Sequence, residues 1–91
     1  MTVEVSIPTQ LRGLTQDKSE VAVSGTTVAE VLNALDANYP GIAQRLLDED
    51  GRLRRFVNVY LDEEDVRFLD GLSTPVTDAS RLSIIPAVAG G

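Results

Sequence analysis

The sequence predicts a single α+β domain, with one main helix packed on one face of a mixed sheet of four to five strands. Short segments near both ends of the chain alternate apolar and polar residues, which is typical of half-buried strands. One central segment instead repeats apolar residues at three-and-four spacing, which is typical of a helix. The predicted order is strand, strand, helix, strand, short strand, strand, and the 91 residues suffice for one domain but not for two.

The first two strands are predicted at residues 3–7 and 21–23. Pro8 closes the first strand, because proline has no N–H group to donate to a neighbouring strand. A polar loop containing Gly13 joins the two segments. We expect an antiparallel hairpin, although so long a loop leaves its register open.

The main helix is predicted to begin at Thr27 and to end before Pro40. Thr27 is followed three residues later by Glu30, the spacing of a capping box. Pro40 and Gly41 then stop the helix, and residues 42–47 can add one or two further helical turns. The apolar stripe of the helix consists of Val28, Val31, Leu32, Leu35 and Tyr39.

The second half of the chain returns to a period of two. Residues 56–61 form a predicted strand, and the charged turn 62–65 separates it from a short strand at 66–68. The last strand is predicted at 82–85. Pro86 ends it, so that the following residues leave the sheet edge in an extended direction.

The composition excludes several kinds of chemistry. The chain has no Cys, no His and no Trp, so it lacks disulfides, thiolate nucleophiles, Cys or His zinc ligands and the usual hydrolytic triads. We therefore expect a protein that is not itself an enzyme, with no catalytic and no metal-binding residue.

Charge and hydropathy indicate the kind of partner and the location. Fourteen acidic residues against eight basic ones give a net charge of −6, which disfavours nucleic acid and favours a basic partner surface. No basic leader and no apolar run of about 20 residues is visible, so we expect a cytoplasmic protein that does not bind a membrane.

The C-terminus carries the functional signal. The prediction divides the chain into a domain at residues 1–86 and a flexible tail at 87–91, whose residues are small, apolar and uncharged. Two terminal glycines arise by chance in roughly one chain in 200. A terminal carboxylate is ionised and a poor electrophile, so transfer chemistry requires its activation inside a partner's active site. Gly90 and Gly91 have no Cβ atom, so such an end can enter a narrow channel without a steric clash.

Several segments carry a resemblance to a known family. The order of elements and the ending PAVAGG resemble the β-grasp sulfur carriers of the ThiS and MoaD families, which share their fold with ubiquitin. Residues 5–9, 37–39, 55–58, 64–68 and 86–91 resemble the CysO type of carrier in particular. The resemblance extends over nearly the whole chain.

The resemblance implies a reaction cycle carried out by partners. An E1-like or MoeB-like enzyme would use ATP to adenylate Gly91, and sulfide would then form a terminal thiocarboxylate. The carrier itself would bind no cofactor. A sulfur-accepting synthase, either a cysteine synthase or a secondary-metabolite synthase, would take the sulfur. In the cysteine pathway a metallopeptidase would then release cysteine and regenerate the Gly-Gly end.

The resemblance also implies docking through the open face of the sheet. The predicted chemical site is Gly91, and the predicted tail that enters the partner is Pro86, Ala87, Val88, Ala89 and Gly90. The predicted docking residues are Phe56, Tyr60 and Ile85, which alternation places outward. The competing interpretation is that loops cover these three residues, or that they are scattered surface residues without a role.

Alternative functions remain open at this point. A MoaD-like chain would serve as the small subunit of molybdopterin synthase. A ThiS-like role in thiazole formation is disfavoured by the additional segment 41–55. A ubiquitin-like protein modifier would instead be joined to lysines of target proteins, and an interaction domain would carry an inert tail.

Overall fold

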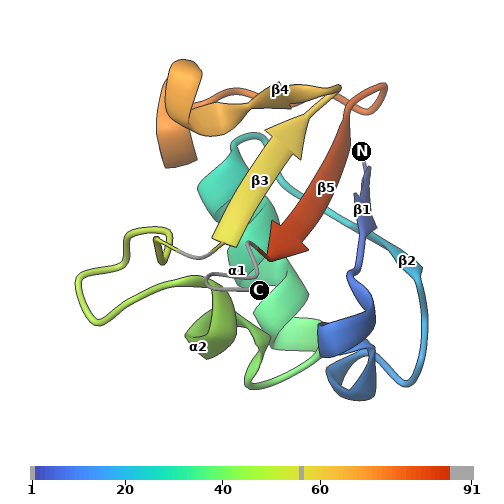
Figure 1. Cartoon of the computed structure of the whole chain (residues 1–91). Helices are drawn as coiled ribbons and strands as arrows, with labels where there is room; N and C mark the ends of the chain where they lie inside the picture. Colours follow the sequence, from blue (N-terminus) through green and yellow to red (C-terminus); the bar gives the residue numbers. More distant parts are fainter. Residues whose placement is uncertain (1, 56, 87–91) are drawn as a thin grey trace.

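The computed structural model describes residues 2–55 and 57–86, which form a mixed sheet covered on one face by helix α1 (Figure 1). The strand order in the described part is β2-β1-β5-β3-β4, so the sheet has five strands. The strands are β1 (Val3–Ser6), β2 (Glu20–Val23), β3 (Val57–Leu61), β4 (Glu64–Asp65) and β5 (Arg81–Pro86). The helices are α1 (Val28–Asn38) and α2 (Ile42–Leu46), with 3-10 helices at Thr9–Leu14, Val66–Phe68 and Gly71–Ser73. The predicted α+β architecture is confirmed.

The last strand lies in the middle of the sheet. β5 is parallel to β1, with Val5 opposite Leu82, and antiparallel to β3, with Val59 opposite Ile84. β1 and β2 form the predicted antiparallel hairpin, with Val5 opposite Val21. The expectation that the chain leaves from the edge of the sheet is therefore wrong. β5 lies between β1, from the first half of the chain, and β3, from the second half.

The core lies between α1 and the inner face of the sheet. The side chains of Val31, Leu32 and Leu35 on α1 have no solvent exposure. The inward residues of the strands are buried as the alternation predicts, and they comprise Val3, Val5, Val21, Val23, Val57, Val59, Leu82 and Ile84. Full burial of one such side chain contributes about 1.5–3 kcal/mol, so this set supplies most of the driving force for folding.

The start of α1 is capped as predicted, with one displacement. The Thr27 hydroxyl accepts a hydrogen bond from the Glu30 N–H at 3.2 Å. The Glu30 carboxylate reaches back to Thr26 instead of Thr27, accepting from its N–H at 2.9 Å and its hydroxyl at 2.8 Å. These two bonds, the backbone one first, lower the pKa of Glu30 below its ordinary value.

The predicted second helix is present as α2, and a left-handed residue introduces it. Gly41 has φ = +103°, a backbone angle that glycine adopts without a Cβ clash. Ile42 and Leu46 share one side of α2, and both are fully buried.

Two predicted segments are corrected. The loop between β1 and β2 contains the 3-10 helix Thr9–Leu14, whose first turn the Leu11 N–H closes on the Pro8 carbonyl at 3.0 Å. The short strand expected at residues 66–68 is also a 3-10 helix. The Asp65 carboxylate accepts from the Arg67 N–H at 2.8 Å, a cap that bends the chain out of the sheet. The short strand is Glu64–Asp65 instead.

Candidate functional site

Pro86 ends β5 at a position where a proline costs the sheet little. Asp62 donates its N–H to the Arg81 carbonyl at 3.0 Å, which makes that pair a hydrogen-bonded one. Because hydrogen-bonded and non-hydrogen-bonded pairs alternate in an antiparallel ladder, Val57 and Pro86 face each other as a non-hydrogen-bonded pair. No carbonyl of β3 therefore lacks a hydrogen-bond donor because residue 86 is a proline. The described chain ends beside Val57, the first residue of β3.

The predicted chemical site lies outside the described residues. Gly91, Gly90, Ala89, Val88 and Ala87 all follow Pro86 in the chain, and of the predicted tail only Pro86 is placed. The roles of these residues stay predictions from the sequence. The structure locates the point from which they extend, at the end of the central strand.

The outer face of the sheet next to Pro86 holds two of the three predicted docking residues. Ile85 points away from the core, and 47% of its surface is exposed. It pairs with Asn58, and Tyr60 lies two residues further along β3 on the same face, half-buried. Phe56, the third residue, lies outside the described residues.

The other end of the outer face is ionic. Arg81 lies 3.0 Å from the Glu4 carboxylate and 3.7 Å from the Glu20 carboxylate. These three side chains come from β5, β1 and β2. Large apolar and ionic side chains thus occupy opposite ends of the same face, and Ile85 lies at the end with Pro86.

One arginine holds the chain together beside Pro86, and no sequence pattern indicated a role for it. The guanidinium of Arg67 donates to the Asn58 side chain at 2.7 Å and to the carbonyls of Arg54 at 2.8 Å and Val57 at 2.7 Å. These bonds tie the 3-10 helix after β4 to the beginning of β3. The contacts span 9 to 13 residues, so no local pattern indicated them.

A second unpredicted feature is an exposed aromatic ring. Phe68 has 85% of its surface exposed, and Leu69 beside it has 37%. The prediction of a strand at 66–68 hid this exposure, because alternation would have placed Phe68 on the same face as the buried Val66.

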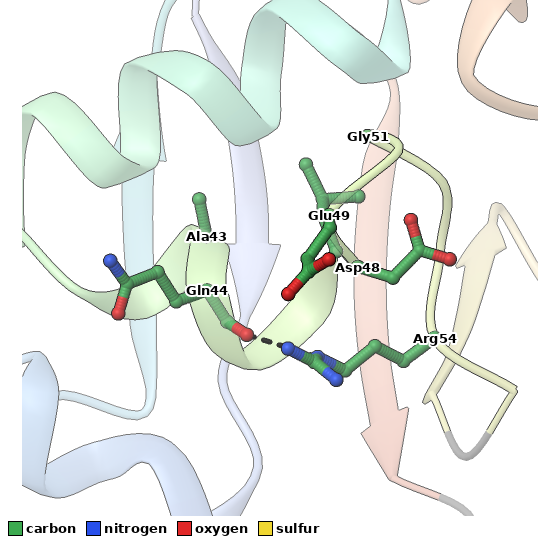
Figure 2. Close-up of a pocket in the computed structure, with 7 residues that line it drawn as sticks. Ala43, Gln44, Asp48, Glu49, Gly51 and Arg54 are labelled. Carbon is green, nitrogen blue, oxygen red and sulfur yellow. Dashed lines mark hydrogen bonds between the residues drawn. The ribbon is translucent and has the colours of Figure 1, made fainter.

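A shallow pocket beside α2 has Asp48, Glu49 and Arg54 among its lining residues (Figure 2). It measures about 470 Å³ and lies between α2 and the loop that follows it. Arg54 closes one side by donating its Nε–H to the Gln44 carbonyl at 3.0 Å. The Asp48 carboxylate accepts from the N–H groups of Asp50 and Arg52, so it stabilises its own loop.

Two further properties hold for the described part of the chain. It contains no cluster of three or more acidic, His or Cys side chains arranged to hold a metal ion. None of its helices has the length and apolar character needed to cross a bilayer.

Comparison with known proteins identifies the class. The ThiS family model matches residues 5–91. The chain is 50% identical to the sulfur carrier protein CysO of Mycobacterium tuberculosis over 93 aligned positions, covering all of both chains. It is 45% identical to small archaeal modifier protein 3 of Haloferax volcanii over 71% of this chain and 70% of that protein. The Amycolatopsis orientalis BexX/CysO complex contains a chain with a TM-score of 0.92 and 47% identity, covering 98% of this chain and 99% of that one.

The fold, with its central last strand leading to a Gly-Gly end, is that of a ubiquitin-like β-grasp protein. The chain belongs to the ThiS family, and its likeness to CysO over the full length supports a role as a sulfur carrier.

Proposed function

We propose that this protein carries sulfur as a thiocarboxylate at Gly91, formed by a partner enzyme that first adenylates the terminal carboxylate. The observation that carries the proposal is the identity of 50% to a sulfur carrier protein over the full length of both chains. The family match extends to residue 91 and so includes the terminal Gly-Gly pair. The position of Pro86 supports it, because the central strand delivers the chain to a point beside an open, partly apolar sheet face.

In the proposed reaction, the terminal carboxylate is the only group of this chain that reacts. A carboxylate oxygen of Gly91 attacks the α-phosphorus of ATP, and pyrophosphate leaves. Sulfide then attacks the acyl carbon, and AMP leaves with the original oxygen. The product holds sulfur as a nucleophile, and the carrier has no cysteine to compete with sulfide for the activated carbon.

The proposed partners follow from the same cycle. An E1-like or MoeB-like enzyme supplies ATP and the site of activation, and a synthase accepts the sulfur. The CysO likeness favours cysteine formation, with a metallopeptidase to restore the Gly-Gly end, or a secondary-metabolite synthase. The solved complex of a relative with BexX supports a carrier that docks onto another protein.

Intact-mass spectrometry tests the proposal. The protein is incubated with ATP, sulfide and an activating enzyme of the E1 or MoeB type, and its mass is compared with that of a chain lacking Gly91. We expect a gain equal to the difference between one sulfur and one oxygen atom, absent from the shortened chain. No gain in the full chain, under conditions in which the same enzyme loads a known carrier, would contradict the proposal.

A second candidate function is protein modification. It is favoured by the 45% identity to a small archaeal modifier protein over about two thirds of the chain. A modifier would be recovered from cells as high-mass adducts that survive denaturation and thiols, joined through Gly91 to lysines. A carrier would be recovered as the free chain, with or without terminal sulfur.

A further inference from the structure

The basic residues are unevenly distributed, and half of them lie in the segment before β3 or in the 3-10 helix after β4. Four of the eight, Arg52, Arg54, Arg55 and Arg67, flank the first residue of β3, and all four are exposed. We name these four the arginine collar.

Contacts show that the arginine collar is one cluster. Arg67 bonds the carbonyls of Arg54 and Val57, and it lines a shallow hollow together with Arg52. Arg55 lies inside the tight turn that the Val57 N–H closes on the Arg54 carbonyl at 3.0 Å. Val57 in turn faces Pro86 across the ladder, so the collar adjoins the exit of the tail.

Internal ion pairing does not account for the collar. Within the described chain, the ion pairs closer than 4 Å are those of Arg81 with Glu4 and Glu20. The carboxylates of Asp48 and Asp65 lie nearer the collar, but they accept from the backbone N–H groups of Arg52 and Arg67 and not from a collar guanidinium. The carboxylates of the turn Asp62 to Glu64 lie at the other end of β3, roughly 15 Å away along the strand. In a chain of net charge −6, these four guanidiniums thus stay without an ion pair among the described residues.

We propose that the arginine collar docks onto an acidic surface around the entrance of the channel that receives the tail. The inference rests on the proposed function, and it names the chemistry of the partner at that site. An adenylating enzyme loaded with ATP has negative charge at this place, and an acidic carrier without local positive charge would be repelled there. The collar offsets that repulsion, speeds encounter and orients the tail toward the nucleotide.

The choice of variants follows from the contacts. Arg67 and Arg54 also hold the backbone, through the three Arg67 bonds and the bond from Arg54 to the Gln44 carbonyl. The side chains of Arg52 and Arg55 make no hydrogen bond to the described residues. The test variant is therefore the double change Arg52→Glu with Arg55→Glu.

Lys18 provides the control. It is exposed and precedes β2, so it lies on the opposite flank of the sheet, about 14 Å away across three strand spacings. A charge reversal there is made as Lys18→Glu, which changes the net charge by two units against four in the test variant. A circular dichroism melt of each variant shows whether the fold is kept.

Steady-state loading by the activating enzyme is measured at low and at high salt. We expect the double arginine variant to raise KM roughly tenfold at low salt with little change in kcat, and the difference to shrink at 0.5 M salt as screening weakens long-range attraction. The Lys18 control is expected to stay within about twofold of the unaltered protein. Reversing acidic residues at the channel entrance of the enzyme to Lys is expected to restore loading of the double variant.

Each contrary result has a distinct meaning. If the unaltered protein is not loaded, the proposed function fails. If it is loaded and the double variant has the same KM, the function stands and the collar proposal is overturned. Tight binding of a single-stranded oligonucleotide by the unaltered protein, lost in the double variant, would assign the collar to nucleic acid and also overturn the proposal.

Discussion

Glu63 has a backbone conformation that glutamate rarely adopts. The two residues between the paired ends of β3 and β4 are Asp62 and Glu63, with φ values of +51° and +82°. Turns of this kind favour Asn or Asp at the first position and Gly at the second. Asp62 fits, and its carboxylate accepts from the Arg81 N–H at 3.0 Å, whereas Glu63 is strained.

Glu63→Gly is expected to stabilise the fold. Relief of strain outweighs the greater freedom of glycine in the unfolded chain, and the net gain is about 1 kcal/mol, or a rise in Tm of roughly 4–8 °C. Glu64→Gly is the matched control, because Glu64 is an exposed strand residue without positive φ and should lose about 0.5–1 kcal/mol. Thermal unfolding of both variants provides the measurement, and equal losses would show that Glu63 is unstrained.

At the scale of elements, the connection from β2 to α1 depends on the close approach of Gly25 to Val31. A Cβ atom built on Gly25 would lie 2.8 Å from the Val31 backbone nitrogen and 2.8 Å from its Cγ2 atom. β2 and α1 can therefore approach this closely only because residue 25 has no side chain.

Gly25→Ala is expected to cost about 1–3 kcal/mol, since α1 must move away from the sheet or strain its first turn. Gly13→Ala is the control, because nothing lies within 4 Å of the added atom there. It should leave stability unchanged or raise it slightly. Chemical denaturation distinguishes the two, and a neutral Gly25→Ala would mean that α1 shifts freely.

The elements predicted from the sequence are those whose cause is local. β1, β2, β3, β5 and the stripe of α1 follow from alternation or helical spacing, and all five are present. The 3-10 helix Val66–Phe68 was missed because an Asp65 cap overrides two apolar residues at strand spacing. Apart from the β1–β2 hairpin, the pairing order was also inaccessible, because a strand pattern does not say which neighbour the strand joins.

For the molecule as a whole, the outer face next to Pro86 is where docking is expected. Its large apolar side chain is Ile85, opposite the polar Asn58, and the rest of the face ends in the ion pairs of Arg81. Removal of Ile85 from a partner interface would therefore affect binding more than folding.

Ile85→Asp is expected to raise KM for loading severalfold while stability changes by no more than about 1 kcal/mol. Ser83→Asp places the same charge one outward position further from Pro86 and is expected to have the smaller effect on loading. Loading kinetics and thermal unfolding are measured on both variants. Normal loading of Ile85→Asp would remove the outer face from the docking surface.

By itself the sequence determined the α+β class, the inward residues and the terminal Gly-Gly, because these depend on periodicity and on residue type. Only the tertiary structure decided that β5 is central, that Arg67 holds the start of β3, and that the arginine collar gathers beside Pro86. These features join residues far apart in the chain, and the free energy that selects them comes from burial of the whole core and not from any local segment.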